Sequence, residues 1–173
     1  RYYMEAKKYQ FVDSVHLVNE KYTIDSQQLD FYSNSSNAYL FGPSTIVSKD
    51  SRIYCERGFY DTKRDLGYFL KDAKLYYNNS IVEGDSLYFD RGRNYASAVN
   101  HIKVTDTLNK TVVRGHFAEI YRAQDSMYIT KRAVVVGLQD NDSIYIHSDT
   151  IKVVGPPDSR ITKAYYNAKI FKS

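Results

Sequence analysis

Few side chains in this sequence have the types and spacing that catalysis or metal binding requires. Its four histidines are His16, His101, His116 and His147. None of them stands in an HxxxH or HExxH spacing and no CxxC pair is present, so the usual zinc and redox motifs are missing. His116 and His147 flank equivalent positions of a sequence repeat, where a metal pair is one interpretation. Surface turn residues are the simpler one, and we expect no metal site.

Two carboxylates and one thiol complete the candidates for chemistry. Asp61 and Asp90 occupy equivalent repeat positions; paired carboxylates can hydrolyse glycosidic bonds, but stacked repeats produce such pairs without any catalytic role. Cys55 is the only cysteine, so no intrachain disulfide can form. Its place among the small residues of the repeat predicts a buried structural thiol. The sequence therefore predicts a protein that is not an enzyme, with no catalytic residue and no cofactor.

An internal repeat governs the elements that carry these residues. Around each small residue, one apolar or aromatic position precedes it by two residues, and two more positions follow it by three and five residues. The frame occurs as Ile24-x-Ser26-x-x-Leu29-x-Phe31, Ile53-x-Cys55-x-x-Gly58-x-Tyr60, Val82-x-Gly84-x-x-Leu87-x-Phe89, Val113-x-Gly115-x-x-Ala118-x-Ile120 and Ile146-x-Ser148-x-x-Ile151-x-Val153. The small residues are 29, 29, 31 and 33 positions apart, and such a period indicates stacked supersecondary units.

Each repeat reads as three short strands separated by turns. Residues 37–41 and 45–47, for example, read as strands on either side of a Gly-Pro-Ser turn at 42–44. No segment has the 3.6-residue period of an amphipathic helix. We therefore expect an all-β fold, a single repeat-built domain over residues 1–173 with about 29–33 residues per repeat.

Strict alternation of side chains would place the apolar positions of one frame on opposite faces of a strand. Ile24 shares its parity with Ser26, whereas Leu29 and Phe31 share the other parity. A corner or bulge at the small residue and its two polar followers would return both sets to one interior. We expect Ser26 and its four equivalents to form these corners.

Composition sets broad limits on function. The 173 residues include 24 basic and 20 acidic side chains, a net charge of +4 without a run of like charge. This gives a mild preference for anionic partners and does not indicate nucleic acid. No apolar run reaches the length of a membrane span, so no transmembrane segment is expected. The 18 tyrosines suit half-buried strands, with the ring packed inward and the hydroxyl in water.

The end of the sequence matches the middle of an earlier repeat. Residues 168–171, Ala-Lys-Ile-Phe, resemble Ala-Lys-Leu-Tyr at 73–76. The corner that should follow would lie beyond Ser173. We therefore expect the chain to stop inside a repeat and the full protein to continue.

The repeated residues resemble a known family. The resemblance rests on residues 15–32, on Gly-Phe-Tyr-Asp at 58–61 and on Leu-Tyr-Phe-Asp at 87–90. It is to the OstA-like family, the LptA-type periplasmic proteins of lipopolysaccharide transport that bridge the inner and outer membranes. The phrase DSLYFD at 85–90 is similar to versions of this family in Bacteroidetes-type bacteria. At the corner the family often has Ala-Asp, whereas this chain has Ser26-Gln27 and four other pairs.

The resemblance implies a twisted, partly open β jelly roll. Two antiparallel sheets would form a V, and their inner faces would hold the acyl chains of lipopolysaccharide. A periplasmic location is also implied, together with end-to-end strand addition to other copies of the chain or to other transport components. The unpaired strands at the two ends of a stacked repeat suit such addition.

Thirteen residues are expected to face this interior and to contact lipid. They are Ile24, Leu29, Phe31, Ile53, Tyr60, Val82, Leu87, Phe89, Val113, Ile120, Ile146, Ile151 and Val153. Apolar contact with acyl chains would supply most of the affinity, with lysines and arginines at the rim orienting the phosphates. The alternative is a structural β-repeat module with a closed, filled core, which binds polysaccharide or protein partners.

Overall fold

The computed structural model describes residues 1–139 and 142–173, and its strands form one antiparallel sheet. The strands are β1 (Tyr2–Tyr3), β2 (Lys8–Val18), β3 (Tyr22–Tyr32), β4 (Asn37–Ser48), β5 (Ser51–Asp61), β6 (Leu66–Tyr77), β7 (Ser80–Asp90), β8 (Tyr95–Asp106), β9 (Thr111–Tyr121), β10 (Ser126–Gln139), β11 (Asp142–Val154), β12 (Ile161–Tyr165) and β13 (Lys169–Lys172). Two short 3-10 turns, η1 (Arg122–Gln124) and η2 (Pro157–Ser159), lie in the connections. The predicted all-β class is confirmed.

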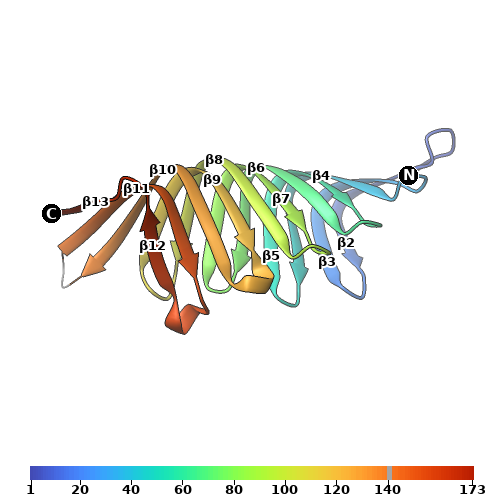
Figure 1. Ribbon diagram of the computed structural model, residues 1–173. Coiled ribbons are helices and arrows are strands. Elements are labelled where there is room, and N and C mark those ends of the chain that lie inside the picture. The colour runs from blue at the N-terminus through green and yellow to red at the C-terminus, as the bar shows by residue number, and fades with distance from the viewer. Residues whose placement is uncertain (140–141) are drawn as a thin grey trace.

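Each strand from β1 to β12 pairs with the next one along the chain, and β13 pairs with β11 beyond the end of β12. The sheet is therefore an uninterrupted meander. It forms an elongated stack with the two termini at opposite ends (Figure 1). Among the described residues, no helix has the length and apolar character needed to cross a membrane.

The long strands bend near their middles, which folds the sheet into two facing halves. Half-sheet 1 contains residues 22–26 of β3 and their equivalents, and half-sheet 2 contains residues 28–32 and theirs. Side chains from both halves belong to one buried cluster. The ring of Tyr22 in half-sheet 1, for example, lies edge-on to the ring of Tyr60 in half-sheet 2, with centroids 5.2 Å apart. The V expected from the resemblance is thus formed.

The corner between the half-sheets is a bulge in every even-numbered strand from β2 to β10. In β2, Asp13 and Ser14 oppose the single residue Gln27 of β3, and both have left-handed backbone angles, with φ of 63° and 68°. The equivalent residues are Gly42 and Pro43, Lys71 and Asp72, Asn100 and His101, and Lys131 and Arg132. A bulge bends a strand without ending its ladder. The predicted turn at 42–44 is therefore wrong: β4 runs through it as one strand.

The predicted mixing of parities is confirmed at this corner. Ile24, Ser26 and Leu29 are all buried, at 1%, 5% and 0% exposure, although strict alternation would separate Leu29 from the other two. The bend lies at the small residue, as expected, but the left-handed backbone lies in the neighbouring strand. The reason is that a bulge inserts its extra residue into only one strand of a pair, and here that strand is the neighbour of the one with the small residue.

Small residues are required at the corner because the backbones approach closely there. A Cβ on Gly115 would lie 2.5 Å from Cγ2 of Ile129 and 2.9 Å from the carbonyl oxygen of Thr130. Where the residue is serine, its hydroxyl bridges the bend. The Oγ of Ser26 donates to the carbonyl oxygen of Gln28 at 2.8 Å, and Oγ of Ser148 makes the same bond to Thr150 at 2.7 Å.

The tyrosines correct another expectation. Tyr22 and Tyr60 do pack inward, but seven other tyrosines form, together with Phe59, a ladder of rings on the outer face of half-sheet 2. It comprises Tyr32, Tyr39, Phe59, Tyr68, Tyr88, Tyr95, Tyr121 and Tyr128, with neighbouring centroids 4.9–6.4 Å apart. Cross-strand aromatic pairs stabilise a sheet on its solvent face as well as on its core face, so tyrosine content alone does not indicate which way the rings point.

The last strands repeat the pattern of the earlier ones. Tyr166 and Asn167 have φ of 64° and 53° and occupy the position of the left-handed pair in the other corners. The strand β13 follows them and pairs with residues 144–147 of β11. Residues 168–171 thus take the place that 73–76 take in β6, as their sequence match predicts.

Candidate functional site

The interior between the half-sheets contains every residue predicted to line it. Ten of the thirteen are at most 3% exposed: Ile24, Leu29, Ile53, Tyr60, Val82, Leu87, Phe89, Val113, Ile120 and Ile151. Phe31, Ile146 and Val153 are partly buried against the same cluster. Because these side chains pack against one another, an acyl chain can reach them only if the two half-sheets separate.

The half-sheets can separate only along the margin opposite the corner, which we call the mouth. At the corner, the backbone of each strand passes from one half-sheet to the other. At the mouth the strands end in turns, and in residues 1–139 and 142–173 the hydrogen bonds and ion pairs between the two margins each involve a side chain. The contacts there join residues 44 to 82 positions apart.

Two ion pairs cross the first part of the mouth. The Nζ of Lys21 lies 2.6 Å from Oδ2 of Asp65, and the lysine side chain is 63% exposed. One coil further on, Nη1 of Arg122 lies 3.0 Å from Oδ2 of Asp50. The arginine side chain of this second pair is only 3% exposed, whereas the aspartate is 52% exposed. In the second pair, the cation is therefore buried while the anion is partly exposed to solvent.

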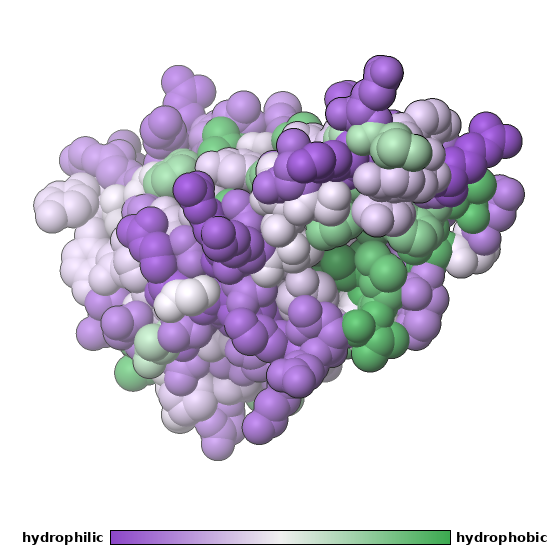
Figure 2. Space-filling model, turned by 90° about the vertical axis from the view of Figure 1, so that its right-hand side faces the viewer, coloured by the Kyte–Doolittle hydropathy of each residue, from purple (hydrophilic) through white to green (hydrophobic). Residues whose placement is uncertain are grey.

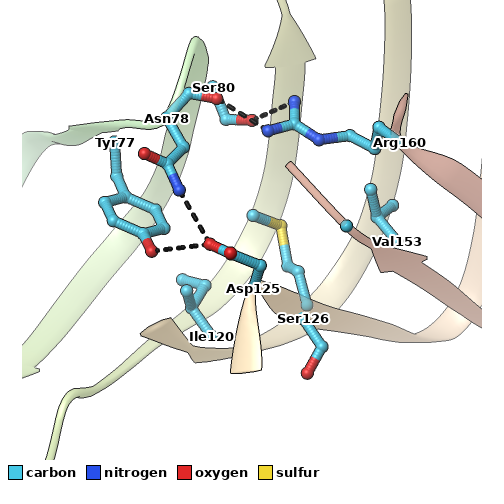
Figure 3. A pocket seen from close by; sticks show the side chains of 10 residues that line it. Tyr77, Asn78, Ser80, Ile120, Asp125, Ser126, Val153 and Arg160 are labelled. Carbon is cyan, nitrogen blue, oxygen red and sulfur yellow. Dashed lines mark hydrogen bonds between the residues drawn. The ribbon is translucent and has the colours of Figure 1, made fainter. Parts of the chain in front are cut away.

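The middle of the mouth is closed around Asp125, at the end of the turn that follows β9. Its Oδ1 accepts a hydrogen bond from Nδ2 of Asn78 at 2.9 Å and lies 3.1 Å from the hydroxyl of Tyr77. Figure 3 shows these side chains approaching from opposite margins. Burial and the nearby Asp125 carboxylate raise the pKa of Tyr77 to about 12, so its hydroxyl remains protonated and able to donate.

Arg160 closes the last part of the mouth. Its Nη1 lies 2.7 Å from Oδ2 of Asp106 and 3.1 Å from Oγ of Ser80, and its Nη2 donates to the carbonyl oxygen of Asn78 at 2.7 Å. The arginine and aspartate side chains are only 7% and 8% exposed. A hollow of about 20 Å³ remains beside them, lined by side chains from both margins (Figure 3).

Asp106 stays ionised in this setting. Burial acts to raise the pKa of its carboxyl group, but hydrogen bonds from Asn109 and the Arg160 guanidinium outweigh burial, and the pKa lies below its ordinary value of 3.8. The buried pair therefore stays charged at neutral pH. Breaking such a pair from one side costs more than breaking an exposed one, because the remaining charge is left poorly solvated.

The predicted pair of carboxylates serves the turns instead. Oδ1 of Asp61 accepts hydrogen bonds from the backbone N–H groups of Lys63 and Arg64, at 3.0 and 2.9 Å. Oδ1 of Asp90 accepts one from Arg93 at 3.0 Å. Both aspartates thus stabilise tight turns, as this residue type commonly does. The arrangement is structural.

The histidines also make local contacts. Nδ1 of His16 lies 2.6 Å from Oδ1 of Asp25, and Nδ1 of His101 lies 2.8 Å from Oδ2 of Asp85. His147 lies edge-on to an aromatic ring of β13, and the whole of β10 separates its strand from the strand of His116. In the described ranges, no three His, Cys, Asp or Glu side chains gather as metal ligands would.

The thiol of Cys55 is placed as predicted. It is 1% exposed and lies at the corner of β5. Burial raises its pKa to about 12. A thiol that is both buried and fully protonated is a poor nucleophile, so Cys55 acts as a small apolar residue in the core.

Sequence reasoning missed the arginines of the mouth, although a signal for two of them was present. Arg91 and Arg122 both follow directly after an odd-numbered strand and so occupy equivalent positions of the repeat. Their partners across the mouth lie at no fixed spacing, since Asp50 is 72 residues from Arg122. The recurrence of arginine at this repeat position can be read from the sequence, but its pairing with Asp50 can be seen only in the folded structure.

The comparison with solved structures agrees with this architecture. No family model matches the sequence, and a search of curated proteins gives no match either. The fold is similar to the crystal structure of LptH from Pseudomonas aeruginosa, described as the LptA homologous periplasmic component of the conserved lipopolysaccharide transport device. The TM-score is 0.55 and the identity 13%, over 71% of this chain and 93% of that chain. The resemblance to LptA-type proteins is thereby confirmed at the level of the fold.

Proposed function

We propose that this chain is a non-enzymatic lipid carrier or bridge, which holds the acyl chains of lipopolysaccharide between its half-sheets. The observation that supports this most is the continuous apolar interior that runs through the stack. At the mouth, this interior is closed by contacts that involve side chains. The similarity to a periplasmic transport component favours the same role. In this proposal the chain works in the periplasm and passes lipid toward the outer membrane.

The energetics of acyl burial favour an opening mouth. Burying an acyl chain is worth about 0.8 kcal/mol per methylene group, so a twelve-carbon chain contributes on the order of 10 kcal/mol. The Lys21–Asp65 pair, whose lysine side chain is 63% exposed, contributes about 0–1 kcal/mol. Breaking the buried Arg160–Asp106 pair costs more, on the order of 3–5 kcal/mol, which is still less than the acyl chain contributes. The free energy gained by burying an acyl chain therefore exceeds the cost of separating the margins, provided that the lipid replaces the contacts that the interior side chains lose.

The two ends of the stack are suited to partners. At the N-terminal end, Phe11, Val12 and Val18 are 39%, 50% and 73% exposed, and Figure 2 shows a hydrophobic patch on this end of the molecule. At the other end, Ile170 and Phe171 of β13 are 72% and 53% exposed. Apolar side chains beside unpaired strands favour strand addition, either to another copy of the chain or to another transport component.

The closed, structural module remains the second candidate, and one observation favours it. The predicted lining residues are almost completely buried against one another, which is typical of a filled core. In that case binding would occur on the outside, and the aromatic ladder of half-sheet 2 would offer its rings to polysaccharide.

Photo-crosslinking distinguishes the two candidates. A photo-reactive residue would replace Phe89, which is 0% exposed in the interior, or Tyr88, its neighbour on the outer ladder, in cells that make lipopolysaccharide. The carrier predicts lipid adducts from position 89. Adducts from position 88 alone would favour the structural module and contradict the carrier.

A further inference from the structure

Two arginines lie one coil apart at the mouth. The backbone N–H of Arg91 donates to the carbonyl oxygen of Asp65 at 3.0 Å, and that of Arg122 donates to Asn94 at 2.9 Å. These are equivalent bonds in successive repeats. Because two strand spacings separate the arginines, their backbones lie about 10 Å apart along the stack.

Both guanidinium groups turn toward the same interior ring. The central carbon of the Arg122 guanidinium lies 4.5 Å from the centroid of Phe89, and that of Arg91 lies 5.5 Å from it. Arg91 also lies 5.8 Å from the ring of Tyr22 in the opposite half-sheet. The two cations thus share the border between the apolar interior and the mouth.

The hydrogen-bonding capacity of these cations is not used up by the described residues. Within the Arg122 guanidinium, only Nη1 has an acceptor among the described residues, on Asp50, although the side chain is only 3% exposed. Its Nε and Nη2 are buried without a partner, and so is Nε of Arg91. Unpaired buried donors of a charged group cost several times more than a typical hydrogen bond contributes.

The carboxylates nearby are already committed. Asp65 pairs with Lys21, and Asp90 accepts bonds from the turn after β7 and from Tyr88. Within the described ranges, Asp50 is left as the one ion-pair partner of Arg122. Burial, opposed by Asp50 and reinforced by the charge of Arg91, holds the pKa of the Arg122 guanidinium below its ordinary value. These carboxylates therefore leave Nε and Nη2 of Arg122 and Nε of Arg91 without an acceptor in the part of the chain that the structure describes.

We propose that Arg91 and Arg122 form an anion subsite that takes a phosphate group, supplied by the headgroup of the lipid whose acyl chains enter beside Phe89. The proposal rests on the proposed function and deepens it. Guanidinium groups bind phosphate oxygens in bidentate geometry, and one phosphate offers enough acceptors for all three unpaired donors. This orientation also places the polar headgroup at the polar mouth and the acyl chains in the apolar interior.

The ion pair with Asp50 gives the subsite a competitor. A phosphate that binds Arg122 must share or displace the carboxylate of Asp50. Asp50→Asn should therefore strengthen the binding of a phosphorylated lipid by about 10-fold, the size expected for one charge-assisted hydrogen bond. If the ion pair is purely structural, Asp50→Asn should destabilise the fold and leave lipid binding unchanged or weaker.

The test compares diphosphorylated lipid A, the same lipid with both phosphates removed, and inorganic phosphate, each titrated against the full chain. Wild type should prefer the phosphorylated lipid by about 100-fold, and Arg91→Gln or Arg122→Gln should each reduce that preference about 10-fold. Arg122→Lys should fall between glutamine and wild type. The matched control is Arg93→Gln, which removes a charge from the same turn where the guanidinium lies over Tyr95, and it should change nothing.

Each outcome bears on a separate claim. Equal affinity of wild type for the two lipids would overturn the subsite and leave the carrier intact. Failure to bind either lipid would overturn the carrier and the headgroup assignment together. Binding of inorganic phosphate alone, lost in the same arginine variants, would support the anion subsite and assign it to a soluble phosphate. If Arg122→Gln does not fold, the Asp50→Asn titration still decides, since unchanged or weaker binding there contradicts the proposal.

Discussion

The corner and the mouth are the two long margins of the same V, and they are held in different ways. At the corner, each strand passes from one half-sheet to the other through a bulge such as Asp13–Ser14 or Lys71–Asp72. At the mouth, the margins are joined by side chains, among them Arg122 and Arg160. Because the backbone is continuous at the corner and the mouth is joined through side chains, any separation of the half-sheets should occur at the mouth.

We therefore expect the corner to govern the stability of the fold and the mouth to govern the access of lipid to the interior. A change at the corner should weaken the whole fold, because both half-sheets depend on the close approach of backbones there. A change at the mouth should affect lipid uptake more than it affects folding. The following variants test this separation, from the largest expected change in the free energy of unfolding to the smallest.

Gly115→Val should be the most damaging of these changes. Its side chain would collide with Ile129 and with the backbone of Thr130, and overpacking of this kind costs about 3 kcal/mol. The free energy of unfolding can be measured by urea denaturation. Gly137→Val is the matched control, since a Cβ there meets only Thr111 at an ordinary 3.5 Å. Equal effects of the two valines would show that the corner is not tightly packed.

Arg160→Met should lower the free energy of unfolding by about 2 kcal/mol, because it leaves Asp106 buried without its cation. The value lies below that of a fully orphaned charge, since Asn109 still donates to the carboxylate. Lipid uptake should become faster in the same variant. Arg64→Met, which removes a 77% exposed side chain, serves as the control. Slower or unchanged uptake in Arg160→Met would argue against the mouth as the route.

Acid should weaken this part of the mouth. The pKa of Asp106 is lowered in the folded protein, so its stabilising effect is fully present above the ordinary pKa of 3.8 and is lost as pH falls through the lowered value. Urea denaturation of wild type and Asp106→Asn should differ by about 1.5 kcal/mol at pH 6, and the difference should shrink steadily as the pH falls below 3.8 and through the lowered pKa of Asp106. A difference independent of pH would mean that the charge of Asp106 contributes nothing.

Lys21→Ala should have the smallest effect, at most about 0.5 kcal/mol on unfolding, because the lysine side chain of its ion pair with Asp65 is 63% exposed. The measurement is again urea denaturation, here at low and high salt. Salt should abolish the small difference, since exposed pairs are screened. A loss above 1 kcal/mol would place this end of the mouth among the contacts that hold the fold together.

The corner could largely be predicted from the sequence and the mouth could not. The recurrence of small residues such as Ser26 and Gly115 gave the period, and the parity change between Ile24 and Leu29 required a bend. The left-handed pairs escaped prediction because no residue type marks them: Asp-Ser, Lys-Asp and Lys-Arg all occur. A bulge accepts many residues when the flanking strands are well paired.

The mouth was hidden for a different reason. Its contacts join turns that come together only after several coils have stacked, as in the approach of Arg160 to Asn78, 82 residues away. No local periodicity specifies which aspartate such an arginine will meet. The outward ladder of tyrosines was missed for a related reason, since aromatic side chains stabilise either face of a sheet.

The central claim is that lipid reaches the interior through an opening mouth, and locking the mouth tests it most directly. Asn78→Cys with Asp125→Cys would replace two side chains that meet across the mouth at 2.9 Å, and a cleavable thiol crosslinker would join them. The control pair is Lys74→Cys with Glu83→Cys, on paired strands of one half-sheet. Buried Cys55, at 1% exposure, should not react.

Uptake of a fluorescent lipid A by each crosslinked protein gives the answer. The account predicts that the lock across the mouth abolishes uptake, that cleaving the crosslinker restores it, and that the lock within one half-sheet has no effect. Undiminished uptake by the protein locked across the mouth would contradict the account.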